Sequence, residues 1–222
     1  VSLWRSTPVT EQIFERLPIT FELGILALCV ALSLAIPIGV ISAMRQDTAL
    51  DYSTRSFSIL MLAVPGFWLA TLAIVFPSIW WGWSPEIKFA RFTEAPFQNL
   101  SQMIVPAIIL GFGLSAITMR LTRTMMLEVM RQDYIRTARA KGLSRMSIVL
   151  KHAARNAAMP VVSIAAVQLG FMLGGSIVIE TVFALHGVGF LAWESISKND
   201  FPTVQAIVLL IAVIYTVLTL LA

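Results

Sequence analysis

The stretch "LGILALCVALSLAIPIGVISA", residues 23–43, carries no charged side chain over 21 residues. A helix rises about 1.5 Å per residue, so about 20 apolar residues cross the hydrocarbon core of a bilayer. The composition of the whole chain agrees, because 58% of its 222 residues are hydrophobic and only 13% are charged. The stretch and the composition together predict a membrane protein.

Four further stretches are apolar and long enough to cross a bilayer. The second is expected to hold one helix that begins at Phe57 and ends in an aromatic cluster at Trp80, Trp81 and Trp83. The sequence therefore predicts an all-α integral membrane protein with five transmembrane helices, in a single domain. The expected spans are residues 20–43, 57–83, 103–119, 157–180 and 201–222.

Positive charge is distributed unequally between the two sides of these spans. The loops at residues 44–56 and 120–158 carry eleven Lys and Arg, whereas the segments on the other side carry five. The positive-inside rule places the eleven in the cytoplasm. Residues 1–18 would then lie outside without resembling a signal peptide, so we expect a fragment that lacks an earlier span and a C-terminal tail.

The loop at 120–158 contains the most basic stretch, "DYIRTARAKGLSRMSIVLKHAARNAAMP", residues 133–160. Strong helix formers predict a helix over residues 126–141, which Gly142 would end with a positive φ. Ser144 is expected to cap a second helix, and Pro160 to start the fourth span. One side of that second helix would hold Met146, Val149, Leu150, Ala153 and Ala157.

Charge alone would suffice for a topology signal or for binding anionic lipid. Neither role needs the small residues Thr137, Ala138 and Ala140 ahead of Gly142, which give a slim helix end. We therefore favour docking to an acidic groove of a soluble partner. Nucleic acid is not expected as a partner, because no aromatic residues are interleaved with these charges.

The basic stretch resembles the cytoplasmic coupling loop of ABC importer permeases of the dipeptide, oligopeptide and nickel group. The flanking segments "STPVTEQIFERLPITFELGILAL", residues 6–28, and "SIVIETVFALHGVGFLAWESISKNDFPTVQAIVLL", residues 176–210, are similar to the same group. The resemblance implies a six-span subunit whose first span is missing here. It also implies that the ATPase-docking residues are Asp133, Tyr134, Arg136, Thr137, Ala138, Arg139, Ala140, Lys141, Gly142, Leu143 and Ser144.

The sequence departs from the wider pattern in two places, a three-residue segment and a single position. Arg136, Thr137 and Ala138 stand where many permeases have Glu-Ala-Ala, as is usual in the peptide group. His186 stands where the group often has proline, and this exchange bears on the shape of an outer loop. Neither departure changes the assignment to the family.

The resemblance implies a transporter made of two permease subunits, two ATPase subunits and an extracytoplasmic solute-binding protein. It places the chain, surrounded by lipid, in the cytoplasmic membrane of a bacterium or archaeon. Peptides, nickel complexes and other small solutes share this scaffold. The sequence leaves open both the substrate and whether the two permeases are identical.

The chain contains no G-x-x-x-x-G-K-[ST] phosphate loop, so we expect ATP hydrolysis to come from partner subunits. No cluster with metal-ligand spacing is present either, and we expect a non-catalytic protein without metal or cofactor. The alternatives are an ATP-independent channel or secondary transporter, which paired intramembrane charges or an inverted repeat would favour, and a membrane enzyme, which would need a convergent polar site.

Small residues recur every four positions in the fourth span, at Ala166, Gly170 and Gly174, with Gly175 beside them. This spacing favours a close helix contact, either within the chain or with a partner subunit.

Glu180 is the one acid close to the membrane interior, and intramembrane acids are costly and usually functional. We favour a structural brace over a substrate contact or an outer gate. Ser115, Thr118 and Gln168 would either line a translocation path or form ordinary helix contacts.

Overall fold

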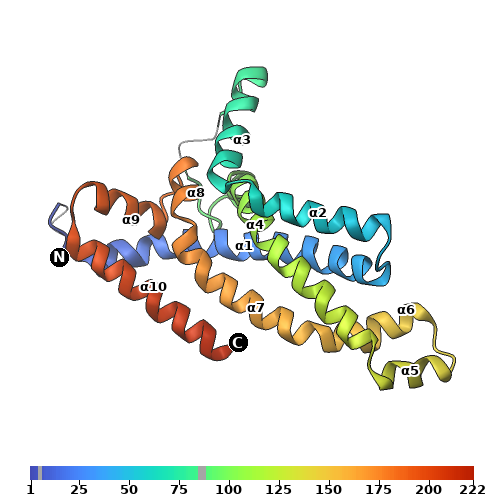
Figure 1. Ribbon diagram of the computed structural model, residues 1–222. Helices are drawn as coiled ribbons and strands as arrows, with labels where there is room; N and C mark the ends of the chain where they lie inside the picture. Colours follow the sequence, from blue (N-terminus) through green and yellow to red (C-terminus); the bar gives the residue numbers. More distant parts are fainter. Residues whose placement is uncertain (5–6, 85–88) are drawn as a thin grey trace.

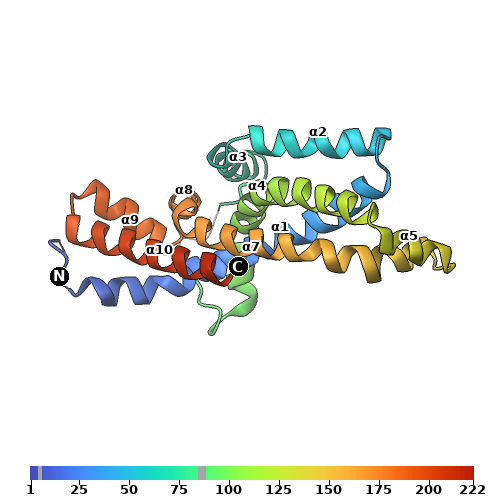
Figure 2. The ribbon, with the colours of Figure 1, turned by 60° about the horizontal axis from the view of Figure 1, so that its bottom comes forward.

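The computed structural model describes residues 1–4, 7–84 and 89–222, and the regular structure in these ranges is helical throughout (Figure 1). Four long helices lie along one another, and α2 runs beside α1 and α4, whereas α3 projects away from them (Figures 1 and 2). The elements are α1 (Val9–Met44), α2 (Ala49–Ala63), α3 (Gly66–Trp81), α4 (Pro96–Met130), α5 (Asp133–Ala140), α6 (Arg145–Ser147), the π-helical turn η1 (Ile148–Ala153), α7 (Ala154–Gly175), α8 (Ile177–Val182), α9 (Val188–Ser197) and α10 (Phe201–Leu221).

Four helices among the described residues are long and apolar enough to cross a bilayer: α1, the continuous run Arg145–Gly175, α4 and α10. A fifth span is present if α2 and α3 count as one, although they meet at 86°. The fold class expected from the sequence, an all-helical membrane protein, is confirmed.

The second apolar stretch differs from the single helix expected from Phe57. The helix begins earlier, at Ala49, and ends at Ala63, after which α3 starts at Gly66. Pro65 explains the break, because a proline forces the residue before it out of the helical region. Val64 is accordingly extended, with φ −86° and ψ 120°.

Helix α1 begins at Val9, well before the expected span at residue 20. Its first turns are helical because Val9 and Ile13 are buried against Leu191 of α9 and Ile207 of α10. Pro18 lies inside this helix, so the segment is not a separate polar arm.

Helices α1 and α4 pack closely along each other. Ala27, Ala31 and Ala35 of α1 are completely buried, at the four-residue spacing that lets two backbones approach. A Cβ atom added at Gly39 would lie 2.8 Å from Cβ of Thr122, and one added at Gly111 would lie 2.7 Å from the carbonyl oxygen of Ala27. Only glycine fits at these two crossings.

The single helix expected over residues 126–141 is wrong, because α4 ends at Met130 and α5 starts separately at Asp133. Gln132 between them is extended, with φ −70° and ψ 150°. This turn lets α5 fold back and bury Ile135 in the cluster that holds Met126 and Val149.

Ser144 caps the next helix as expected: its Oγ accepts a hydrogen bond from the backbone N–H of Ser147 at 3.3 Å. The helix then passes through η1 into α7 without interruption, so Pro160 lies inside α7 and does not start it. The five apolar residues expected along one side of this helix do not all share one environment. A π-turn adds a residue and rotates the faces that follow, and Ile148 and Val149 are buried whereas Met146 and Leu150 are exposed.

Candidate functional site

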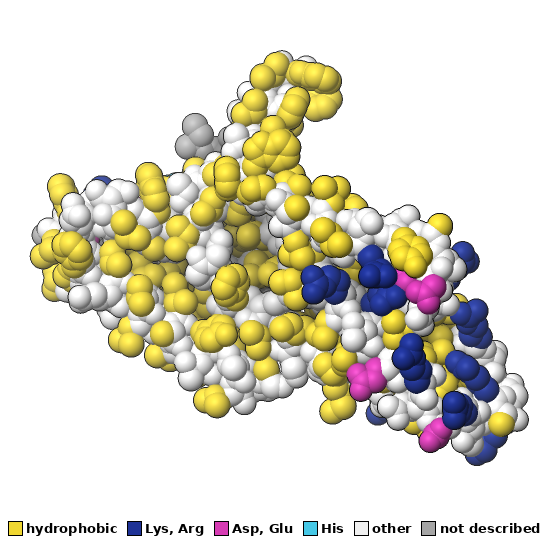
Figure 3. Space-filling model, viewed as in Figure 1, with side chains coloured by type: hydrophobic (Ala, Val, Ile, Leu, Met, Phe, Trp, Pro, Cys, Tyr) yellow, Lys and Arg dark blue, Asp and Glu magenta, His cyan; other side chains and the backbone are white. Residues whose placement is uncertain are grey.

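The charged end of the molecule is formed by α5, α6 and the adjoining ends of α2 and α4. Figure 3 shows Lys and Arg side chains gathered there, while the remainder of the visible surface is largely apolar or uncharged. We call this the basic end. Its outermost part is an exposed surface on α5, the docking face, made of Asp133, Tyr134, Arg136, Thr137, Arg139, Ala140 and Lys141.

Four expected docking residues lie outside this surface: Gly142, Leu143 and Ser144 follow α5, and Ala138 is on its inner side. Ala138 is buried, together with Ile135, against the chain's own cluster around Met126 and Val149. The small side chain at 138 therefore lets α5 pack on its own protein. Among the small residues expected to form the slim helix end, Thr137 and Ala140 are the exposed ones.

The turn after α5 is fixed by its backbone. Gly142 has a φ of +79°, which confirms the positive value expected from the sequence. Its N–H donates to the carbonyl of Arg139 at 2.9 Å, and the N–H of Leu143 donates to that of Ala138 at 3.3 Å. This pair of bonds is a Schellman motif, which satisfies the last carbonyls of the helix.

Two further hydrogen bonds tie the basic end to the long helices. Asn156 Nδ2 of α7 donates to the hydroxyl of Tyr134 at 2.6 Å. Arg145 Nη2 donates to the carbonyl oxygen of Met44 at the end of α1, also at 2.6 Å. The docking face therefore sits on a small unit that is fastened to α1, α4 and α7.

A cavity of about 430 Å³ opens beside the docking face. It is lined by Met130, Arg139, Leu143, Arg145 and Ile148, so two guanidinium groups face an apolar floor. This arrangement suits a partner side chain that is itself partly apolar and carries an acidic or carbonyl oxygen.

Glu180 lies at the opposite part of the molecule, where α8 and α9 meet α1. Its side chain is completely buried, and Oε1 accepts hydrogen bonds from the hydroxyls of Thr20 at 2.9 Å and Ser176 at 2.8 Å. Its Oε2 accepts from the N–H of Phe190 at 2.9 Å. Thr20 in turn accepts from the N–H of Val188 at 2.8 Å, so one carboxylate joins three helices.

Glycine is required where α9 starts, because the chain closes around this carboxylate. A Cβ atom added at Gly187 would lie 2.5 Å from Oε2 of Glu180, and one at Gly189 would lie 2.9 Å from it. This enclosure of Glu180 by its own chain favours the brace interpretation over a substrate contact.

Asp200 makes a second buried carboxylate centre near the start of α10. It accepts hydrogen bonds from the hydroxyls of Ser2 at 2.5 Å and Thr203 at 2.8 Å, and from the N–H of Leu3 at 3.2 Å. Burial acts to raise its pKa, but these bonds outweigh burial and hold the pKa below its ordinary value. The two centres together define the α8–α9 end of the molecule.

Two of the three candidate path residues form a contact between α4 and α7, and the third, Ser115, faces Met61 of α2. Thr118 donates to Oε1 of Gln168 at 3.0 Å, and Gln168 Nε2 donates to the carbonyl of Leu114 at 3.3 Å. Ser115 is completely buried and donates to the carbonyl of Phe112 at 2.7 Å. These contacts favour the helix-contact interpretation over a lining of the path.

The small-residue stripe of α7 divides into three environments. A Cβ atom added at Gly170 would lie 3.0 Å from Cδ2 of Tyr215, so α7 and α10 approach closely within the chain. Gly174 and Gly175 are exposed, and a Cβ atom at Gly174 would meet nothing within 4 Å. Ala166 lines an apolar groove instead.

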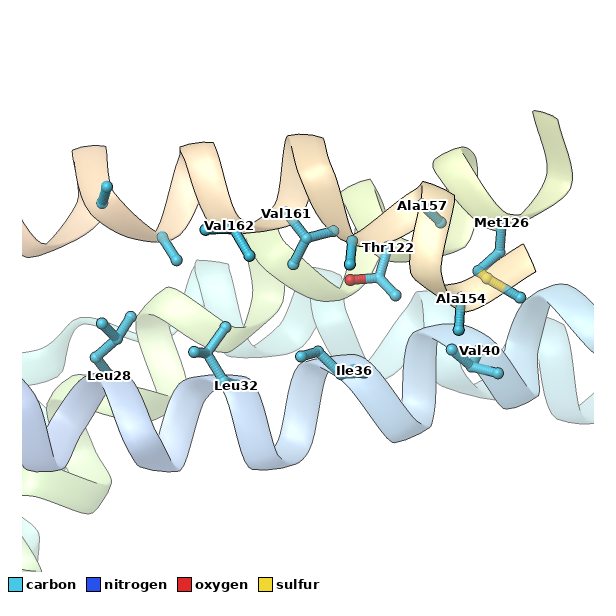
Figure 4. Close-up of a pocket in the computed structure, with 13 residues that line it drawn as sticks. Leu28, Leu32, Ile36, Val40, Thr122, Met126, Ala154, Ala157, Val161 and Val162 are labelled. Carbon is cyan, nitrogen blue, oxygen red and sulfur yellow. The ribbon is translucent and has the colours of Figure 1, made fainter. Parts of the chain in front are cut away.

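That groove, of about 340 Å³, runs between α1, α4 and α7 (Figure 4). Leu28, Leu32 and Ile36 of α1 face Val161 and Val162 of α7 across it, and Thr122 supplies a polar atom from α4. The walls are too apolar to recognise a peptide backbone, which needs hydrogen-bond partners. Among the described residues, no group of three or more His, Cys, Asp or Glu could hold a metal ion.

The sequence reasoning missed an ion pair that fixes the basic end. Arg123 of α4 donates to both carboxylate oxygens of Asp51 of α2, each at 2.7 Å, and Ser42 of α1 donates to Asp51 at 2.5 Å. Asp51 is completely buried. The sequence carries no clear signal for this ion pair, since Asp51 shares the segment 44–56 with Asp47, Arg45 and Arg55, and its partner Arg123 lies far along the chain.

The chain is similar to known transport proteins along nearly its whole length. Residues 35–222 match the family described as binding-protein-dependent transport system inner membrane component. The dipeptide transport system permease protein DppB of Escherichia coli (strain K12) is 33% identical over 246 residues, which cover 100% of this chain and 72% of DppB. DppB of Bacillus subtilis (strain 168) is 38% identical over 96% of this chain and 67% of its own length.

Solved structures share the fold at lower identity. The inward-facing MetNI methionine ABC transporter matches with a TM-score of 0.78 and 17% identity, over 97% of this chain and 94% of the solved chain. An amino acid ABC transporter crystallised with histidines matches with a TM-score of 0.71 and 14% identity, over 96% and 91%.

The fold and these matches define an importer permease, a transport subunit and not an enzyme. The chain belongs to the family of binding-protein-dependent transport system inner membrane components. Members of this family work with ATPase and solute-binding partners, and the resemblance drawn from the sequence is confirmed.

Proposed function

We propose that this permease carries peptides, and that its docking face binds an ATPase subunit on the cytoplasmic side. The relatives support the substrate class, because two that are 33% and 38% identical are named for dipeptide transport. One observation supports the docking face above all: a short, exposed, positively charged helix is held rigidly by a buried inner side and a glycine turn.

The connection from α5 to the long helices gives a route for movement. Ile135 and Ala138 of α5 share a cluster with Met126 of α4, Val149 of η1 and Ala157 of α7. Because a close-packed cluster is hard to deform, a partner that displaces α5 moves the basic ends of α4 and α7 with it. Both helices border the apolar groove, so this movement changes the groove that they form with α1.

The complete transporter in this proposal has two permease subunits, two ATPase subunits and an external binding protein. ATP binding and hydrolysis occur on the ATPases, because this chain lacks a phosphate loop. The basic end faces the cytoplasm, where the positive-inside rule places the loop at residues 120–158. The α8–α9 end faces outward, towards the binding protein.

The test is uptake of a labelled dipeptide into vesicles that contain the assembled transporter. We expect uptake to require both ATP and the loaded binding protein. Uptake of the dipeptide without ATP would favour a channel or secondary transporter. If a nickel complex is taken up with ATP and no peptide is, the ATP-driven mechanism stands and the peptide assignment is wrong.

A further inference from the structure

A second basic feature lies away from the docking face, on the side of the molecule between α2 and α4. It is a cavity of about 310 Å³, which we call the arginine pocket, lined by Arg55, Ser58, Ile59, Arg120, Arg123 and Thr124. We propose that the arginine pocket binds the phosphate of an anionic phospholipid headgroup.

The charge balance of the pocket leaves two guanidinium groups for a ligand. Arg123 is occupied by the buried carboxylate of Asp51. Arg55 and Arg120 are exposed, and among the described residues neither forms an ion pair. With Asp51 counted, the pocket and its partner carry a net charge of about +2, and Asp47, which also acts on Arg123, reduces the excess to about +1, which a phosphate diester would neutralise.

The other polar side chains of the pocket already donate hydrogen bonds, so the arginines are the groups that can donate to a ligand. The hydroxyls of Ser58 and Thr124 already donate to the backbone carbonyls of Arg55 and Arg120, at 2.8 and 3.0 Å. Planar guanidinium groups match two phosphate oxygens at once and are weakly hydrated. The ligand that this geometry favours is therefore an anion that accepts bidentate hydrogen bonds.

The surroundings favour a lipid over a soluble anion. The neighbouring part of α2 exposes Phe57, Ile59 and Leu60, which are 42%, 61% and 58% exposed. Ile59 itself lines the pocket, and Phe57 and Leu60 continue the apolar surface around the same turn of α2, where acyl chains can pack. In Figure 3 the apolar surface gives way to Lys and Arg towards the basic end. A bilayer would match this change, because its hydrocarbon core gives way to charged headgroups.

The orientation proposed above adds an electrostatic argument. If the basic end faces the cytoplasm, the pocket lies at the leaflet that carries anionic lipid, where each Lys or Arg near the surface strengthens binding. The inference rests on that orientation but not on docking to the ATPase or on the substrate.

The experiment is native mass spectrometry of the purified, assembled transporter, titrated with phosphatidylglycerol or with phosphatidylcholine of the same chains. The test variant is Arg55→Gln/Arg120→Gln, which leaves the Arg123–Asp51 pair intact. The matched control is Lys151→Gln/Arg155→Gln, which removes two exposed charges from η1 and α7 at the same end. Size-exclusion chromatography confirms that each variant is assembled.

We expect the parent to prefer phosphatidylglycerol, and the test variant to weaken its binding about tenfold or more while the control changes it less than threefold. Equal weakening in both variants, or none in the test variant, would overturn the proposal. So would competition by millimolar inorganic phosphate as strong as that by the lipid, because the site would then belong to a soluble anion.

Discussion

The α8–α9 end and the docking face hold their charged groups in opposite ways. At the α8–α9 end, Glu180 and Asp200 are buried, and each accepts several hydrogen bonds from its own chain. At the basic end, Arg136, Arg139 and Lys141 stand exposed on a helix whose inner side is fixed. The carboxylates of the α8–α9 end are satisfied by the chain itself, whereas the charges of the docking face are exposed.

This difference has an energetic basis. A buried carboxylate is tolerated only when its oxygens are satisfied, and removing its partners or the acid itself leaves costly unpaired groups. Exposed charges on a surface helix contribute little to folding, typically below about 1 kcal/mol per pair. Substitutions at the α8–α9 end should therefore damage the fold, and those on the docking face should spare it.

The largest expected effect is that of Glu180→Ala. It leaves the hydroxyls of Thr20 and Ser176 and the N–H of Phe190 without their acceptor, at a cost of roughly 3 kcal/mol. We expect thermal unfolding in detergent at a clearly lower temperature and a large loss of monodisperse protein. Glu180→Gln keeps one oxygen acceptor and should fall between this variant and the parent. Parental stability of Glu180→Ala would show that Glu180 is not a structural brace.

Gly170→Leu should come next, because its side chain would meet Tyr215 where α7 and α10 approach. Overpacking of this kind costs about 1–3 kcal/mol. Gly174→Leu is the matched control on the same helix, and it should be nearly neutral since its position is open. Recovery of assembled transporter after purification measures both. Equal recovery of the two variants would mean that the Gly170 contact does not matter to the fold.

Ala138 and Ala140, two residues apart on α5, test its inner side and the docking face separately. Ala138→Trp should overpack the inner cluster and loosen α5, at a cost of about 1–3 kcal/mol. Ala140→Trp should leave stability unchanged and still reduce ATP-driven uptake, because the bulky ring stands on the docking face. Hydrogen exchange over residues 133–147, beside uptake, distinguishes them. Full uptake by Ala140→Trp would show that this part of α5 touches no partner.

A smaller effect is expected at the turn. Gly142→Val places a β-branched residue at a φ of +79°, which costs about 1–2 kcal/mol and should fray the end of α5. Gly142→Asn should be milder, because asparagine tolerates this conformation better. Limited proteolysis near residue 142 reports the fraying. Equal resistance of the valine variant and the parent would mean that the turn tolerates the strain.

The features that were predicted from the sequence depend on local chemistry. Apolar length gave the helical membrane class, the cap at Ser144 needed only its own turn, and Gly142 followed from the helix ending before it. The features that were missed depend on partners distant in the chain. Asp51 forms an ion pair with Arg123 across the bundle, and burial of Ile135 packs α5 against η1.

The stripes of small residues show the same limit. Ala27, Ala31, Ala35 and Gly39 of α1 have the spacing that was noticed on α7, and it is the α1 stripe that is buried against α4. On α7 only Gly170 makes a close contact of this kind. Spacing reveals that a close approach is possible, but the position of the neighbouring helix decides whether it occurs.

The central claim is that the exposed charges of α5 hold an ATPase subunit. The most direct measurement is co-purification of the ATPase with Arg136→Glu/Arg139→Glu, compared with Lys151→Glu/Arg155→Glu, which makes the same charge change outside the docking face. We expect parental stability for both variants and loss of the ATPase, more severe at high salt, for the α5 variant alone. Parental ATPase recovery by the α5 variant, or equal loss in both, would contradict it.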